Sequence, residues 1–195
     1  MPTLHSTLSG ADLHEPKGIE SASAGTVYVA NGTGSGNWLS TYAYGSLSIN
    51  KNSITKTISL PAALDATLNT DTDYRKIVGT DMWLTGESSN VTLDVTNGEI
   101  VITVPGTYQI SYCNSHKINT ADSRVIAWKC AVNGVLSVNK LVDTSSGSGT
   151  VNSVGGSQIK TLVAGDKVSM YAATTVADTL EIGDASLSVV LIKAY

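Results

Sequence analysis

The most constraining stretch of this sequence lies between positions 91 and 104, where two alternating apolar runs flank an Asn-Gly pair. The first run is VTLDV at 91–95, the pair is Asn97–Gly98, and the second run is IVITV at 100–104. Asn-Gly between alternating apolar residues is the strongest short signal for a β-hairpin, because both residues tolerate a positive φ. The stretch therefore predicts two paired strands.

The same pattern continues along the chain. A Pro-Gly pair at 105–106 ends the hairpin, and the next alternating run predicts a strand with one apolar face: Tyr108, Ile110 and Tyr112. A second hairpin is predicted at 124–138 across Asn133–Gly134, and its apolar face contains Ile126, Trp128, Cys130 and Val132. The pattern then predicts two strands within 157–174, joined at 164–166, and a last strand at 185–195. Only the segment 61–69 favours a helical turn. Regularly spaced strands of this kind indicate a β-sandwich or barrel.

The order of these pieces resembles the globular head of the C1q-like and tumour-necrosis-factor-like superfamily. The resemblance covers roughly residues 54–195. The matching positions are Gly98, Pro105, Gly106, Tyr108, Ser111, Tyr112, Asn133, Gly134, Leu162, Gly165, Asp166, Val168, Ser186 and Leu187. The resemblance implies an all-β jelly-roll β-sandwich and a homotrimer.

The apolar strand faces also predict an interface. The tyrosine-rich face at 108–112 is not expected to share one core with Trp128 and the apolar C-terminal strand unless some apolar surface is covered elsewhere. Large amphipathic side chains suit an interface in a weakly charged protein. The predicted trimer-interface residues are Tyr108, Ile110, Tyr112, Met170, Tyr171 and Leu191. The alternative is a monomer with an ordinary core.

The N-terminal stretch differs from the rest, because its apolar residues stand isolated among Gly, Ser and Thr. It resembles a leader of tailed-phage structural proteins, in which a Leu-His-Glu-Pro-Lys-Gly motif precedes a small strand pair and a Gly-rich turn ending in Trp. The residues predicted to bind a partner are Leu8, Leu13, His14, Glu15, Pro16, Lys17 and Trp38. An irregular arm cannot bury such anchors by itself, but it can bury them against a neighbour. We expect an extended attachment arm at 1–40, a linker at 41–53 and the head at 54–195.

The search for chemistry predicts neither an enzyme nor a cofactor. The three histidines, His5, His14 and His116, lack the spacing of a metal site, and we expect His116 at the surface beyond a strand end. The segment from Asn69 to Asp73 resembles the opening of a calcium loop but lacks its Gly and closing Glu, which favours a polar loop over a calcium site. Two cysteines, Cys113 and Cys130, are expected as buried reduced thiols in neighbouring strands.

The charge of the chain and the composition of its segments limit the functions that it can have. Charged residues are 14% of the chain and the formal net charge is −4, which argues against nucleic-acid binding. No signal peptide or membrane-spanning stretch is found, so we expect assembly in a cytoplasm. The resemblance of the N-terminal stretch to a phage leader implies residence in a virion, on the capsid surface. A fibre would need a long trimeric stalk, which is missing. The favoured function is therefore a trimeric capsid decoration (cement) protein whose arm binds the major capsid protein or neighbouring subunits. The alternative is a tail or baseplate tip that recognises a host surface glycan or protein.

Overall fold

Alternating patterns of this kind fold into strands through most of the part of the chain that the structure describes. The computed structural model describes residues 22–30, 36–49, 56–79, 81–118, 120, 122–145 and 149–195. These residues form two compact units, Met1–Thr41 and Tyr42–Tyr195, and each is described by itself. No helix within the described ranges is long and apolar enough to cross a membrane.

The first unit contains an antiparallel strand pair, β1 (Thr26–Ala30) and β2 (Gly36–Ser40). Tyr28 and Trp38 lie opposite each other, and their rings meet edge to face with centroids 5.4 Å apart. Val27 and Val29 alternate with Tyr28 and remain 46% and 43% exposed. A two-stranded ribbon of this size has no core of its own.

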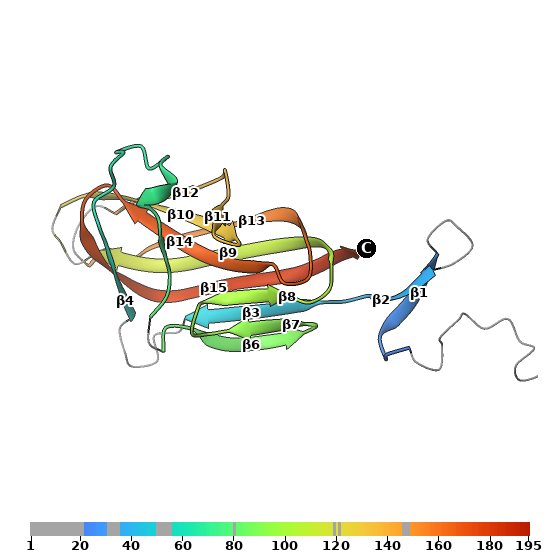
Figure 1. The fold of residues 1–195 in the computed structure, drawn as a ribbon. Coiled ribbons are helices and arrows are strands. Elements are labelled where there is room, and N and C mark those ends of the chain that lie inside the picture. Colours follow the sequence, from blue (N-terminus) through green and yellow to red (C-terminus); the bar gives the residue numbers. More distant parts are fainter. Residues whose placement is uncertain are drawn as a thin grey trace, which may run out of the picture. The chain divides into compact units, whose positions relative to one another are not determined.

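The second unit is a sandwich of two antiparallel sheets (Figure 1). The seven-stranded sheet has the order β11 (Val135–Leu136), β10 (Arg124–Val132), β14 (Lys167–Thr174), β8 (Glu99–Ile102) and β7 (Val91–Asp94). In addition, β12 (Leu141–Ser145) pairs with β10 and β5 (Arg75–Lys76) pairs with β14. The six-stranded sheet has the order β13 (Asn152–Leu162), β9 (Gly106–Ile118), β15 (Asp178–Ala194), β3 (Tyr44–Ile49) and β6 (Leu84–Ser89), with β4 (Lys56–Leu60) paired to β15.

The connections between the two sheets define a jelly roll. The chain passes from β8 to β9 to β10, and later from β13 to β14 to β15, and it changes sheet at each of these steps. Such wrapping of a chain around two facing sheets is the jelly-roll topology. The predicted all-β jelly-roll sandwich is confirmed. The predicted irregular arm falls mostly on residues outside the described ranges.

The turns follow the residue types that the sequence places there. Asn133 and Gly134 form a two-residue turn between β10 and β11, with φ of 53° and 79°. The strands β13 and β14 are joined at 163–166 as predicted, but they belong to different sheets and do not pair with each other. The segment 61–69 forms no helix, and a short 3-10 turn occupies Asp71–Asp73 instead.

The core holds the residues that were predicted to form the trimer interface. Tyr108 and Ile110 are 0% exposed, Met170 1%, Tyr112 5% and Leu191 9%, and all five belong to one apolar cluster between the sheets. The assignment of these residues to an interface is therefore wrong. The long strands β9 and β15 give the sandwich a core large enough for the whole set, and the Tyr108 hydroxyl donates to the Val104 carbonyl at 2.7 Å.

Tyr171, the remaining predicted interface residue, lies on the opposite face of β14. It is partly buried against a second small cluster, which consists of Leu68, Tyr74, Ala127 and Ala173. Leu68 and Tyr74 come from the segment before β5, so this segment covers part of the outer face of the seven-stranded sheet. The Tyr171 side chain therefore also packs mainly against residues of its own chain.

The predicted linker at 41–53 contains a strand of the sandwich. The strand β3 lies between β15 and β6, and its inward side chains Leu47 and Ile49 are 0% and 1% exposed. Gly45 also faces inward, where an added Cβ would lie 2.4 Å from a Val91 methyl carbon. The head therefore begins at Tyr42 rather than at residue 54.

Candidate functional site

The outer face of the six-stranded sheet carries an exposed apolar row. The strand registers place four outward side chains side by side across β13, β9, β15 and β3: Ile159, Gln109, Val190 and Tyr44. Three of the four are apolar or aromatic, with exposed fractions of 66% for Ile159, 51% for Val190 and 40% for Tyr44. Within the described residues of the second unit, nothing covers this row.

The next two rows on the same face consist of small side chains. Two residues further along each strand, the register aligns Ser157, Ser111, Ser188 and Ser46. Two residues beyond these, it aligns Gly155, Cys113, Ser186 and Ser48. None of the residues in the three rows is charged. Together we call these three rows the neutral face.

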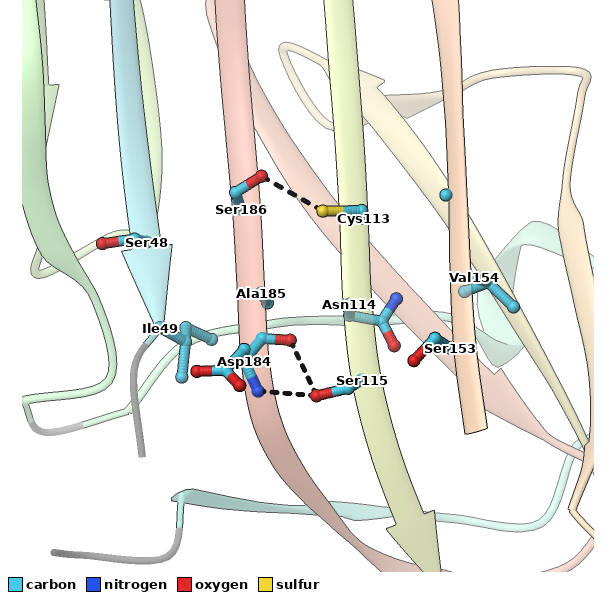
Figure 2. A pocket seen from close by; sticks show the side chains of 11 residues that line it. Ser48, Ile49, Cys113, Asn114, Ser115, Ser153, Val154, Asp184, Ala185 and Ser186 are labelled. Carbon is cyan, nitrogen blue, oxygen red and sulfur yellow. Dashed lines mark hydrogen bonds between the residues drawn. The ribbon is translucent and has the colours of Figure 1, made fainter. Parts of the chain in front are cut away.

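A shallow groove of about 640 Å³ lies at one end of the neutral face (Figure 2). It forms where β15 has a register shift between Ile182 and Ala185, so that Gly183 and Asp184 lie opposite the single residue Ser115 of β9. The Ser115 hydroxyl oxygen accepts a hydrogen bond from the Asp184 amide at 2.9 Å. At Gly183 an added Cβ would lie 2.7 Å from that hydroxyl oxygen, so a larger residue there would displace the Ser115 hydroxyl from this hydrogen bond. The groove is lined by small side chains such as Ser153 and Ser186, by the Asp184 carboxylate and by the aliphatic side chains of Ile49 and Val154.

Charged residues border the neutral face. Beyond the groove, Lys117 and Glu181 form an ion pair at 2.9 Å. Past the apolar row, the Lys193 ammonium lies 5.5 Å from the centroid of the Tyr195 ring. An uncharged centre with a polar margin is the anatomy of a protein–protein interface.

The groove shows no arrangement for nucleophilic catalysis within the described residues. The Cys113 sulfur lies 3.3 Å from the Ser186 hydroxyl oxygen, and the residues that line the groove include no histidine to act as a base. Activation of a thiol or hydroxyl would need such a base or a cation beside it. The geometry favours contact with another surface.

His116 was expected at the surface, and this expectation is wrong. The residue lies within β9 and is 1% exposed. Its Nδ1 is 2.7 Å from Asn114 Oδ1, its Nε2 is 3.2 Å from Asp143 Oδ2, and its ring is tilted against Trp128 with centroids 5.2 Å apart. Burial lowers the pKa of His116 below its ordinary value of 6.5, while the Asp143 carboxylate opposes that shift. The residue links the two sheets from inside, because Asp143 belongs to β12.

The side chains of the candidate calcium loop have other partners. Asp73 accepts from the Leu64 amide at 3.0 Å and from the Asp65 amide at 3.3 Å. The Asp71 carboxylate pairs with Lys129 at 2.9 Å, and Asn69 Oδ1 accepts from Lys140 at 2.7 Å. Among the described residues, no three His, Cys, Asp or Glu side chains gather as a metal site would require. The loop is thus tied to the sheet by hydrogen bonds.

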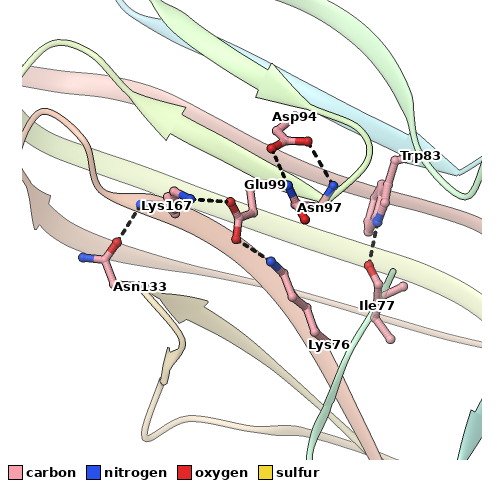
Figure 3. Close-up of polar contacts among 8 residues, drawn as sticks. All are labelled: Lys76, Ile77, Trp83, Asp94, Asn97, Glu99, Asn133 and Lys167. Atoms are coloured by element: carbon pink, nitrogen blue, oxygen red, sulfur yellow. Dashed lines mark hydrogen bonds and ion pairs between the residues drawn. The ribbon is translucent and has the colours of Figure 1, made fainter. Parts of the chain in front are cut away.

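A cluster of polar contacts joins β5, β8 and β14 at the end of the other sheet (Figure 3). Glu99 lies between Lys76 and Lys167, with the second ammonium 3.2 Å from the carboxylate. Burial acts to raise the pKa of Glu99, but the two lysines together hold it below its usual value. Nearby, the Trp83 indole N–H donates to the Ile77 carbonyl at 2.7 Å. These contacts hold the sheet together.

The predicted arm and the cysteines are only partly described. Six of the predicted arm residues lie outside the described residues: Leu8, Leu13, His14, Glu15, Pro16 and Lys17. Trp38 is described and lies on β2 beside Tyr28. Both thiols are free, but only Cys130 is buried, while Cys113 is exposed on a strand of the other sheet. The expectation of two buried thiols in neighbouring strands is therefore wrong.

The neutral face was missed by the sequence analysis, although a signal for it exists. The segments SLSI at 46–49 and SLSV at 186–189 alternate serine with large apolar residues. The apolar positions predict the buried side, and the serines then predict an outer side without charge. The lateral alignment of four strands, however, comes only from the register.

Comparisons with known proteins concern the fold. The chain matches no protein-family model and no curated protein. Among solved structures it is similar to the globular domain of zebrafish complement 1qA protein, with 16% identity over 78% of this chain and 99% of that chain and a TM-score of 0.48. It is also similar to Eiger TNF from S. frugiperda, with 13% identity, 77% and 93% coverage and a TM-score of 0.46. Murine APRIL matches with 13% identity, 77% and 99% coverage and a TM-score of 0.49. The jelly-roll assignment rests on the strand order described above.

Proposed function

We propose that this chain is a structural protein without enzymatic activity, and that it assembles as a homotrimer through the neutral face. The observation that carries the proposal is the apolar row Ile159, Val190 and Tyr44 at the edge of an uncharged surface. Full burial of a Val or Ile side chain contributes about 1.5–3 kcal/mol. The number three comes from the resemblance of residues 54–195 to C1q-like and tumour-necrosis-factor-like heads.

The other rows of the neutral face favour a second copy of this chain as the partner. Serine and glycine side chains allow two backbones to approach closely. Each chain has a formal net charge of −4, so copies repel one another except where they meet through uncharged groups. A face with no charged residue is therefore the surface on which identical copies associate at the lowest electrostatic cost.

The specific role that we propose is decoration of a tailed-phage capsid. The support is the resemblance of residues 11–38 to a leader of phage structural proteins. In this proposal Leu8, Leu13 and Trp38 are apolar anchors on the shell, Glu15 and Lys17 contact its polar rim, and Pro16 stiffens the segment between them. Three arms on one trimer bind together, so a modest affinity per arm becomes a strong avidity.

The trimer is tested by sedimentation velocity of the full chain. Val190→Asp introduces a charge into the apolar row, and we expect it to convert a trimer into a monomer. Val138→Asp is the matched control, because Val138 is 94% exposed in the loop after β11 and lies outside the neutral face. A monomeric parent chain at micromolar concentration, or a trimeric Val190→Asp variant, would contradict the proposal.

The attachment role is tested by co-sedimentation with capsids of the phage that encodes the chain. Residues 42–195 contain both sheets and the whole apolar core, so a chain without residues 1–41 is expected to fold. We expect the full chain to co-sediment with capsids and the shortened chain to remain in solution. If the shortened chain binds host cells instead, the tail-tip function replaces decoration.

A further inference from the structure

A cavity of about 230 Å³ is lined by strands of both sheets at one edge of the sandwich. From β10 and β11 come apolar groups and the Cys130 thiol, and from β13 come Gln158, Lys160 and Leu162. These β13 residues alternate with Ile159, so they point away from the neutral face. The cavity is smaller than the roughly 300–1,000 Å³ of a pocket for a drug-sized molecule, and it would hold a smaller ligand.

Two hydrogen-bond donors at this cavity lack a strong acceptor from the protein. The Gln158 Nε2 atom is buried and has no oxygen or nitrogen acceptor among the described residues, and it interacts with the Cys130 thiol, which is a weak acceptor. The Lys160 side chain is exposed at the edge of the cavity and forms no ion pair in the part of the chain that the structure describes, and neither Asp nor Glu lines the cavity. A buried donor without an acceptor is costly, and native proteins rarely keep one without a reason.

The effect of both donors on the Cys130 thiol indicates that they face the same cavity. Burial raises the pKa of this thiol to about 11, whereas a hydrogen bond from Gln158 and the positive charge of Lys160 act in the opposite direction. The positive charge of Lys160 and the amide N–H of Gln158 therefore both interact with a group that lines the cavity. The rest of the lining is mainly aliphatic, with Val132, Leu136 and Leu162 among its walls.

We propose that this cavity binds a small aliphatic monocarboxylate. The carboxylate accepts hydrogen bonds from the Lys160 ammonium and the Gln158 amide, and the short alkyl chain lies against the valine and leucine side chains. One cation with no acidic residue beside it suits a single negative charge, and the apolar walls favour an alkyl chain over a second polar group. The cavity is separate from the neutral face, so this proposal does not depend on the trimer.

The test uses isothermal titration calorimetry of the full chain with sodium hexanoate, 1-hexanol and sodium acetate as probes. We expect hexanoate to bind saturably at one site per chain and more tightly than either hexanol or acetate. Lys160→Met keeps the aliphatic stem but removes the charge, and it should weaken hexanoate binding by about ten- to a hundredfold. Lys193→Met is the matched control, which removes an exposed lysine elsewhere and should leave the affinity unchanged.

A second measurement locates the ligand. In a Cys113→Ser background, hexanoate should slow the alkylation of Cys130 by iodoacetamide, and it should fail to do so after Lys160→Met. Three results would overturn the proposal: no hexanoate binding to the parent chain, equal binding to the Lys160→Met variant, or hexanol binding as tight as hexanoate. Unchanged alkylation of Cys130 in the presence of bound hexanoate would place the site elsewhere and would also overturn it.

Discussion

Single residues in this fold are fixed by backbone geometry and by buried polar contacts. Gly98 has a φ of +60°, and an added Cβ would lie 2.5 Å from the Trp83 indole nitrogen and 2.8 Å from the Ile77 carbonyl oxygen. It therefore lies beside the hydrogen bond from the Trp83 indole to the Ile77 carbonyl. Figure 3 shows this hydrogen bond. The sequence predicted a turn at Asn97–Gly98, but it did not reveal that a tryptophan packs against it.

We expect Gly98→Ala to destabilise the protein more than Gly165→Ala does. Both glycines have a positive φ, but at Gly165 an added Cβ meets no atom within 4 Å. Left-handed backbone strain alone costs about 1–2 kcal/mol, whereas loss of a buried hydrogen bond adds about 1–3 kcal/mol. Urea unfolding of both variants measures the difference. Equal losses of unfolding free energy would show that the contact at Trp83 contributes nothing.

His116 is the second case at this scale, because it titrates inside the core. Its pKa is lowered in the folded chain by burial, so between that value and 6.5 the unfolded chain binds more protons. The free energy of unfolding should therefore fall as the pH falls below about 6.5, with a slope of at most about 1.4 kcal/mol per pH unit from this residue.

The measurement compares urea unfolding of the parent chain and of His116→Gln from pH 8 to pH 5. Gln keeps a hydrogen-bonding side chain but does not titrate, so the variant should be less stable at pH 8 and should lose less stability on acidification. Carboxylates elsewhere titrate in both proteins, and their contribution cancels in the comparison. Identical pH slopes would mean that His116 has the same pKa in the folded and unfolded chains.

Whole elements were predictable where local residues determine them. Both predicted hairpins form. At Asn133–Gly134 both residues have a positive φ in a two-residue turn, whereas four residues, 95–98, join β7 to β8, and of the Asn97–Gly98 pair only Gly98 has a positive φ. The strand β3 was missed, because its partners β15 and β6 lie far away in the sequence and its serines resemble a linker. The sequence also could not reveal how many apolar residues the core between the two sheets holds. For the same reason, the alternation around Tyr108 identified a buried face that was mistaken for an interface.

We expect Leu47→Ala in β3 to destabilise the protein by about 2–5 kcal/mol, as for other fully buried leucines. Leu47 is 0% exposed, and its strand joins β15 to the edge strand β6. Leu64→Ala is the matched control, because that leucine is 88% exposed and should cost less than about 0.5 kcal/mol. If Leu47→Ala also costs less than this in denaturant unfolding, residues 44–49 act as the linker first predicted.

At the scale of the whole molecule, the distribution of charge predicts how the trimer depends on salt. The chain has a net charge of −4, and the three rows of the neutral face carry no charged residue. Association through this face therefore forms no ion pair that salt could screen, while it brings three negative chains together. Screening reduces that repulsion, because the Debye length falls from about 10 Å at 0.1 M to about 3 Å at 1 M.

We therefore expect the trimer to become tighter, by less than about tenfold, when NaCl is raised from 50 to 500 mM, as measured by sedimentation equilibrium. Val138→Asp makes each chain more negative without touching the neutral face, so this variant should gain more from added salt than the parent chain does. An interface built on ion pairs, such as one centred on Lys117 and Glu181, would respond with the opposite sign, because screening weakens attraction between charges. Dissociation of the trimer at 500 mM NaCl would therefore move the contact from the neutral face to its charged margin.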